Sequence, residues 1–166
     1  MAQRKLVIDR AVEASGGSVL NRRIGVLGAA FKPLTDDVPD SPALNVAAAL
    51  HLRGARVVIV DPEATGTAQR MFPTLAYADS VEEAAAGADV LLVLTEWAQF
   101  RQIYPVALVD FVSMPVIIDA RNCLDAATWR DAGWRYSGLG VTPADGATAA
   151  PVARESAALS RLAPTM

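Results

Sequence analysis

The stretch 28–42, GAAFKPLTDDVPDSP, gathers the charged and turn-forming residues that could do chemistry in this sequence. Lys32 offers an ammonium that either meets a phosphate or sugar hydroxyl as a point charge or stays solvated in its loop. Asp36 and Asp37 either bind Mg²⁺ or cap N–H groups of their own loop, and capping is the commoner use of such aspartates. Because the stretch follows a short apolar run, we expect it to lie where open α/β sheets bind their ligands.

The glycines of this stretch do not fit a dinucleotide-binding turn. A G-x-G-x-x-G fingerprint that starts at Gly28 has Ala30 and Pro33 at its second and third positions. The next helix signal is Ser41, roughly a dozen residues after the strand, where a tight turn has about two to six. We therefore expect a poor cradle for the pyrophosphate of NAD.

Further polar residues follow other apolar runs. Asp61 either holds ribose hydroxyls, as the acid at this place does in dinucleotide-binding domains, or starts a turn with Pro62. Arg121 offers either a planar fork for phosphate or a structural salt bridge. The segment 95–97, Thr-Glu-Trp, either walls the same crevice or packs structurally through Trp97.

Cys123 and His51 are the single cysteine and the single histidine of the chain. One cysteine cannot form an internal disulfide, and one of each residue cannot complete a Cys/His zinc site. Neither residue has the partners of a catalytic triad, so we interpret both as structural and assign no metal site and no catalytic residue.

Short apolar runs alternate with helical segments along the chain. The runs predict strands at 23–27, 56–60, 90–94, 116–119 and 134–137. Helices are expected at 4–14, 42–53, 81–86, 97–112 with a break at Pro105, and 125–131. This pattern predicts an α/β fold: a Rossmann-like open, mainly parallel sheet of five to six strands, with helices on both faces in three α/β/α layers.

The 166 residues are enough for about one domain. A net charge of −3 and a pI near 5.1 leave no basic footprint for nucleic acid. No apolar run approaches the roughly 18 residues of a membrane span, and the N-terminus lacks the apolar core of a signal peptide. We therefore expect a cytoplasmic protein that binds neither nucleic acid nor membranes.

Four segments together resemble the UDP-binding C-terminal domain of the UDP-glucose 6-dehydrogenase family. They are GAAFKPLTDDVPDSPAL at 28–44, VVIVDPEA at 57–64, ADVLLVLTEWAQF at 88–100 and VIIDARNCLD at 116–125. The resemblance implies a domain that closes over a UDP-sugar such as UDP-glucose, while NAD is held mainly by a separate N-terminal domain. By motif it places Phe31, Lys32 and Arg121 in contact with the substrate.

The chain departs from the family pattern at Pro39, where the family has an Arg that approaches NAD. We therefore expect no cofactor contact from this chain alone. Family catalysis uses a cysteine of the central domain, and Cys123 does not match it, so we expect the isolated chain to be inactive as a dehydrogenase.

The resemblance also suggests a domain division. Residues 1–20 would be the remnant of an inter-domain helix, 21–140 the UDP-sugar-binding domain, and 141–166 an Ala/Pro-rich flexible tail. The expected partners are a UDP-sugar, a central dehydrogenase domain or partner chain, and a second copy of the chain. The alternative hypothesis is a non-catalytic interaction or regulatory module on the same scaffold.

Overall fold

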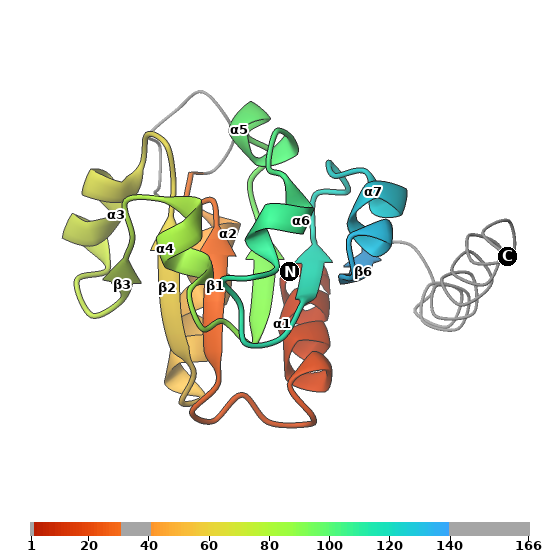
Figure 1. The fold of residues 1–166 in the computed structure, drawn as a ribbon. Helices are drawn as coiled ribbons and strands as arrows, with labels where there is room; N and C mark the ends of the chain where they lie inside the picture. The colour runs from red at the N-terminus through yellow and green to blue at the C-terminus, as the bar shows by residue number, and fades with distance from the viewer. Residues whose placement is uncertain (1, 31–40, 140–166) are drawn as a thin grey trace, which may run out of the picture.

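Six strands form one open parallel sheet in the computed structural model, which describes residues 2–30 and 41–139 (Figure 1). The strands are β1 (Arg23–Leu27), β2 (Arg56–Val60), β3 (Ala76–Tyr77), β4 (Val90–Val93), β5 (Val116–Asp119) and β6 (Arg135–Gly138). Their order across the sheet is β3-β2-β1-β4-β5-β6, and every neighbouring pair is parallel. The chain therefore reverses its direction of travel across the sheet between β1 and β4.

Helices cover both faces of this sheet. They are α1 (Ala2–Ala14), α2 (Pro42–Leu52), α3 (Thr65–Met71), α4 (Val81–Ala85), α5 (Ala98–Arg101), α6 (Pro105–Leu108) and α7 (Ala126–Asp131). Figure 1 shows α1 and α2 behind the sheet, with α4 and α6 in front of it. The result is the three-layer α/β/α arrangement that the alternating pattern predicted.

The central strands are buried on both sides, so they read as continuous apolar runs rather than alternating ones. Every residue of β4, VLLV, is buried. At Gly25 in β1 a β-carbon would lie 2.6 Å from the carbonyl oxygen of Ala84, so glycine is what lets α4 pack directly on β1.

The first helix packs on the domain rather than projecting from it. Val7 and Ala11 of α1 are 3% and 0% exposed, and both belong to the main apolar core. Arg10 Nη1 donates a hydrogen bond to the carbonyl oxygen of Gly138 at 3.2 Å, which connects α1 to β6. Residues 2–14 therefore contribute to the stability of the sheet.

The predicted strands are confirmed with small shifts at their ends. Three of them, 23–27, 56–60 and 116–119, have the expected bounds. The strand predicted at 90–94 ends one residue earlier, and the one predicted at 134–137 begins and ends one residue later. The sixth strand, β3, and the preceding helix α3 were not predicted, because β3 is two residues long and α3 is largely polar.

The helix predictions hold apart from their ends, except that the segment predicted at 97–112 is helical only at Ala98–Arg101 and Pro105–Leu108. Pro105 begins α6 and so separates it from α5, as expected from its missing N–H group. Asp125 caps α7 instead of being its first residue. None of the helices within residues 2–30 and 41–139 is both long enough and apolar enough to cross a membrane. The expected tail, 141–166, lies outside the described residues.

Candidate functional site

The exits of β1, β4 and β5 meet at the carboxyl edge of the sheet. The strand order reverses between β1 and β4, and open α/β sheets bind ligands in the crevice beside such a switch point. The residues that leave these strands are Gly28–Ala30, Leu94–Glu96 and Ala120–Arg121. This edge is therefore the place to look for a ligand site.

Gly28 turns the chain at the end of β1 with a φ of +108°, a value that favours glycine. Its N–H donates to the carbonyl oxygen of Val60 at 2.8 Å. The hydroxyl of Thr95 donates to the carbonyl oxygen of Ala30 at 2.9 Å, and that of Ser41 to the carbonyl oxygen of Ala29 at 2.7 Å. The exit of β1 is thus bonded to its neighbours on both sides.

Two of the three predicted substrate contacts, Phe31 and Lys32, lie in 31–40, outside the described residues. The same holds for Asp36, Asp37 and Pro39. Their assignments stay predictions.

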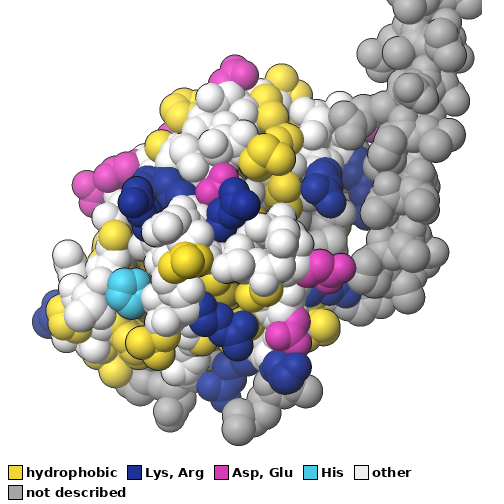
Figure 2. Space-filling view, turned by 90° about the horizontal axis from the view of Figure 1, so that it is seen from below, with side chains coloured by type: hydrophobic (Ala, Val, Ile, Leu, Met, Phe, Trp, Pro, Cys, Tyr) yellow, Lys and Arg dark blue, Asp and Glu magenta, His cyan; other side chains and the backbone are white. Residues whose placement is uncertain are grey.

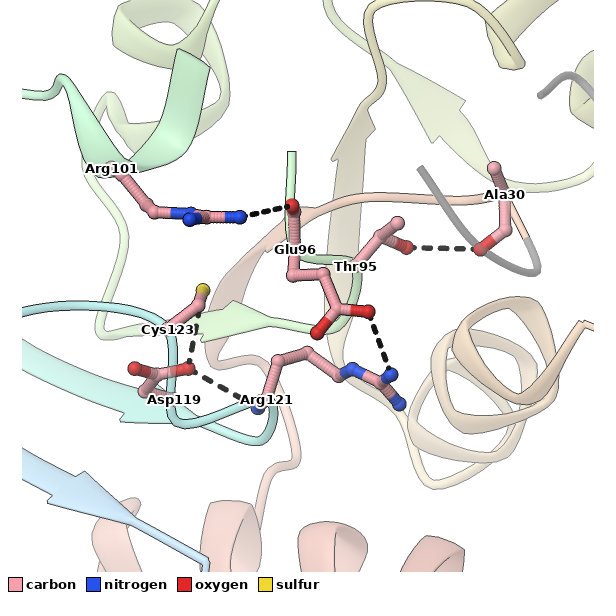
Figure 3. A network of polar contacts seen from close by, with 7 residues as sticks. All are labelled: Ala30, Thr95, Glu96, Arg101, Asp119, Arg121 and Cys123. Atoms are coloured by element: carbon pink, nitrogen blue, oxygen red, sulfur yellow. Dashed lines mark hydrogen bonds and ion pairs between the residues drawn. The ribbon is translucent and has the colours of Figure 1, made fainter. Parts of the chain in front are cut away.

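Arg121 lies at the carboxyl edge as predicted, directly after β5. Its Nη2 is 3.0 Å from Glu96 Oε1, and Figure 3 shows the two side chains reaching toward each other from adjacent strand ends. Both side chains are partly exposed, at 37% and 35%. The sequence left a phosphate contact and a structural salt bridge as the alternatives for Arg121. The salt bridge is present, and the sequence did not identify Glu96 as its partner.

A buried carboxylate fixes the turn that carries Arg121. Asp119 is 0% exposed, and its Oδ1 accepts the backbone N–H of Arg121 at 3.1 Å. Its Oδ2 accepts the N–H of Leu124 and the hydroxyl of Tyr136, both at 2.8 Å. Burial, and then the hydrogen bond to Asp119, raise the pKa of Tyr136 above its usual value, so Tyr136 remains a donor. Asp119 therefore sets the position from which Arg121 extends.

Asn122 completes this turn with a φ of +52° and donates from Nδ2 to the carbonyl oxygen of Leu139 at 2.8 Å. Left-handed backbone is tolerated better by Asn than by most residues, which explains an Asn directly after Arg121. The turn is therefore bonded to the chain beyond β6 as well as to Asp119.

Asp61, after β2, forms a turn with its own chain. Its Oδ1 accepts the N–H groups of Glu63 at 2.9 Å and Ala64 at 2.7 Å, and its side chain is buried. This is the turn-starting role that sequence left as one of two alternatives.

The other oxygen of Asp61 reaches across the sheet. Oδ2 accepts the N–H groups of Ala29 at 2.7 Å and Ala30 at 3.0 Å, and the indole N–H of Trp97 at 3.1 Å. With these contacts Asp61 does not fit the role of a ribose-binding acid. Trp97 is 2% exposed, so its structural packing role is confirmed.

A pocket with about 370 Å³ of empty space, including the part open to solvent, lies beside Arg121. It is lined by Gln3, Arg4 and Val7 of α1, Pro42, Ala43 and Val46 of α2, and Leu94, Ala120 and Arg121 at the strand ends. The N-terminus of α2, capped by Ser41, therefore faces the same space as two arginines. Both features favour an anionic group.

Cys123 and His51 lie in different parts of the fold. Burial, and then the nearby Asp119 carboxylate, raise the pKa of the Cys123 thiol to about 11, so it is protonated near neutral pH. His51 is exposed near the end of α2, at the amino end of the sheet, which is the face seen in Figure 2. In the described ranges there is no group of three or more His, Cys, Asp or Glu side chains that could hold a metal ion.

Residues 25–126 match the model of the UDP-glucose/GDP-mannose dehydrogenase family, UDP binding domain. The chain belongs to this family. It is 39% identical to the UDP-glucose 6-dehydrogenase of Rhizobium meliloti over 131 residues, which cover 79% of this chain and 30% of that protein. It is 34% identical to UDP-glucose 6-dehydrogenase YwqF of Bacillus subtilis over 139 residues, 83% of this chain and 31% of that protein. The chain thus spans about a third of the length of these relatives.

Solved structures of the dehydrogenase family share the fold. A UDP-glucose dehydrogenase from Pyrobaculum islandicum superposes with a TM-score of 0.67 at 28% identity, covering 82% of this chain and 29% of that one. An NDP-N-acetyl-D-galactosaminuronic acid dehydrogenase from Methanosarcina mazei gives a TM-score of 0.71 at 25% identity, over 84% and 29% of the chains.

The four segments that carry the family resemblance end at one edge of the sheet. Gly28, Asp61, Trp97 and Asp119 come from different segments and lie at the exits of β1, β2, β4 and β5. The dehydrogenase family motifs therefore come together at one edge of the sheet. What sequence reasoning missed is the bonding between them, because a motif gives the place of a residue but not its partner.

Proposed function

We propose that this chain binds a UDP-sugar, with UDP-glucose as the candidate, at the carboxyl edge of the sheet beside the switch point between β1 and β4. The observation that carries the proposal is the pocket in which Arg121, Arg4 and the N-terminus of α2 face the same space. Its support is the match to the family's UDP binding domain over 25–126.

The chemistry of a diphosphate suits this arrangement. Arginine offers paired N–H donors to phosphate oxygens, and the positive end of a helix dipole favours anions within its first turn. Lys32 and Phe31 follow directly after the exit of β1 in the sequence and are proposed as the further contacts, by their match to the family motif.

We further propose that residues 1–166 hold the nucleotide sugar without oxidising it. A thiol whose pKa is raised to about 11 is a poor nucleophile near neutral pH, and this is the state of Cys123. The residues at the exit of β1 also lack the glycines of a dinucleotide cradle. In the complete dehydrogenase, NAD and the reacting cysteine would belong to other domains, in the same polypeptide or in a partner chain in the cytoplasm.

The second candidate, an interaction or regulatory module, is favoured by one surface feature. Tyr104, Val106, Phe111 and Met114 form an apolar segment of the chain whose side chains are 45% to 81% exposed. Exposed apolar residues close together in a chain are typical of a surface that meets another protein.

Titration calorimetry with UDP-glucose, UDP and GDP-mannose tests the proposal. We expect the wild-type chain to bind UDP-glucose and UDP, and Arg121→Ala to weaken both by about tenfold or more, as for loss of a charge-assisted contact. Glu13→Gln, an exposed change at the end of α1, is the control. If none of the three ligands gives a binding heat, or if Arg121→Ala leaves the affinity unchanged, the interaction module is favoured. Turnover of UDP-glucose with NAD by the pure chain would overturn the claim that it does not oxidise its ligand.

A further inference from the structure

A buried carboxylate connects the exits of three neighbouring strands. Asp61 follows β2, while Ala29 and Ala30 follow β1 and Trp97 lies beyond the end of β4. Asp61 Oδ2 accepts the two alanine N–H groups and the indole N–H at 2.7, 3.0 and 3.1 Å. Since β1 lies between β2 and β4, the contact with Trp97 spans the end of the central strand.

We infer that Asp61 is a positioning residue of the nucleotide-sugar site, an inference that rests on the proposed function. The carbonyl oxygen of Ala29 accepts the hydroxyl of Ser41 at 2.7 Å, and Ser41 caps the end of α2 that lines the pocket, so the bonds to Asp61 fix the exit of β1 against that helix end. The carboxylate acts on the ligand only through these bonds.

The same oxygen also acts on the segment that carries Glu96. Trp97 follows Glu96, whose carboxylate pairs with Arg121 at 3.0 Å. The bond from the Trp97 indole to Asp61 therefore fixes the segment that carries the partner of Arg121. One buried oxygen thus sets the placement of the β1 exit relative to the segment that carries Glu96.

The positioning role of Asp61 excludes a role as a ribose-binding acid. A carboxylate has about four lone-pair sites, and Asp61 accepts five hydrogen bonds from its own chain. In a dinucleotide-binding sheet the acid at this place accepts ribose hydroxyls instead. Asp61 thus fixes the geometry of this edge of the sheet for a nucleotide sugar. It leaves no free carboxylate to accept the ribose hydroxyls of a dinucleotide.

The variant Asp61→Asn tests the inference, because it keeps the shape of the side chain but turns one oxygen into a nitrogen that cannot accept. Asp89→Asn is the matched control, since Asp89 Oδ2 accepts the N–H of Arg23 at 3.0 Å at the start of β1, the end away from the site. If Asp61→Asn leaves the β1 exit and the segment that carries Glu96 correctly placed for about a tenth of the time, the affinity for UDP-glucose falls about tenfold. We expect Asp89→Asn to stay within about twofold of wild type.

Trp97→Phe provides a second variant that removes only the indole donor and keeps an aromatic ring. We expect the affinity for UDP-glucose to fall about threefold, less than for Asp61→Asn, because Ala29 and Ala30 remain bonded. Circular dichroism of each variant reports whether it is folded.

The backbone amide signals of Ala29 and Ala30 in a ¹⁵N-labelled chain give a readout that needs no ligand. Charge-assisted bonds to Asp61 predict downfield signals that exchange slowly with solvent, lost in Asp61→Asn and retained in Asp89→Asn. If the wild-type chain does not bind UDP-glucose, the proposed function fails. The amide signals of Ala29 and Ala30 still test whether Asp61 holds the exit of β1.

The inference is overturned if folded Asp61→Asn keeps wild-type affinity, or if its Ala29 and Ala30 amides match those of wild type. Should Asp61→Asn not fold, unchanged affinity of Trp97→Phe overturns it. Where wild type binds no UDP-glucose either, Ala29 and Ala30 amides of the wild-type chain that exchange rapidly with solvent overturn it.

Discussion

Glu96 Oε1 lies 3.0 Å from Nη2 of Arg121, so the arginine expected to bind phosphate is already paired with a carboxylate. Figure 3 shows the pair extending from the ends of β4 and β5, with the backbone N–H of Arg121 bonded to Asp119. In the proposed function, an incoming diphosphate would share this guanidinium with Glu96 or displace the carboxylate. We therefore predict that Glu96 lowers the affinity of the proposed site for a diphosphate.

Neutralising Glu96 tests this competition. We expect Glu96→Gln to bind UDP-glucose about two- to fivefold more tightly, because a partly exposed ion pair is worth up to about 1 kcal/mol. Calorimetry at low and high salt measures the effect, which should shrink as salt screens both contacts. Glu13→Gln is the control for a change in net charge alone. Weaker binding by Glu96→Gln would instead make Glu96 a residue that orients Arg121.

Tyr136→Phe removes one donor from the buried carboxylate of Asp119. The hydroxyl bond is 2.8 Å long and the side chain is 9% exposed, so the lost bond should lower the free energy of unfolding by about 1 to 2 kcal/mol. Denaturant unfolding measures it. Tyr104→Phe, at a side chain that is 81% exposed, should change it by less than about 0.5 kcal/mol. Equal effects of the two changes would contradict a bonded Tyr136.

Gly28→Ala should destabilise the exit of β1. At a φ of +108° an added β-carbon would lie 2.5 Å from the side chain of Thr95, and backbone strain adds to this contact. We expect a loss of at least about 2 kcal/mol in the free energy of unfolding.

The matched change is Gly66→Ala in α3, where the nearest atom to the new β-carbon is Arg70 Nη1 at 3.8 Å. It should stabilise the chain by up to about 1 kcal/mol, because alanine suits a helix better than glycine. A stabilising Gly28→Ala would show that the turn differs from the one described.

The thiol of Cys123 should react slowly with alkylating agents and gain reactivity up to high pH. Burial, and then Asp119, raise its pKa from 9.0 to about 11, so the alkylation rate should rise until about pH 11 while a small free thiol levels off near 9.0. The folded state holds this proton more tightly than the unfolded state. Its contribution to stability is therefore present below pH 9.0 and lost as the pH rises through about 11.

Asp119→Asn provides the control for this profile, since removing the negative charge should lower the pKa of Cys123. A rate that levels off at or below pH 9.0 in the wild-type chain would contradict the buried, protonated thiol.

Local signals explain which parts of the fold could be predicted. Ser41 accepts the N–H group of Leu44, so the helix signal identified in the sequence is the cap that starts α2. Central strands were visible because burial on both faces makes each a continuous apolar run. The edge strand β3 has two residues and little burial, so it left no such pattern.

The sequence could predict where the candidate site lies, but not which of its residues bond to one another. Strand ends locate Asp61 and Arg121, because parallel strands bring their carboxyl ends to one edge. Their partners Trp97 and Glu96 are 36 and 25 residues away in sequence, and each partner is chosen by the twist and spacing of the sheet. Residue type alone could not tell whether Asp61 faces a ligand or its own chain.

The position of β1 at the centre of the sheet also governs when the site can come into existence. Of the six strands of this sheet, β1 is made first, but it pairs with β2 and β4, and Ile24 lies opposite Val90. During synthesis, one edge of β1 therefore stays unpaired until β4 has left the ribosome. Arg121 is made later still. During synthesis, the pocket beside Arg121 is therefore among the last features of this sheet to form.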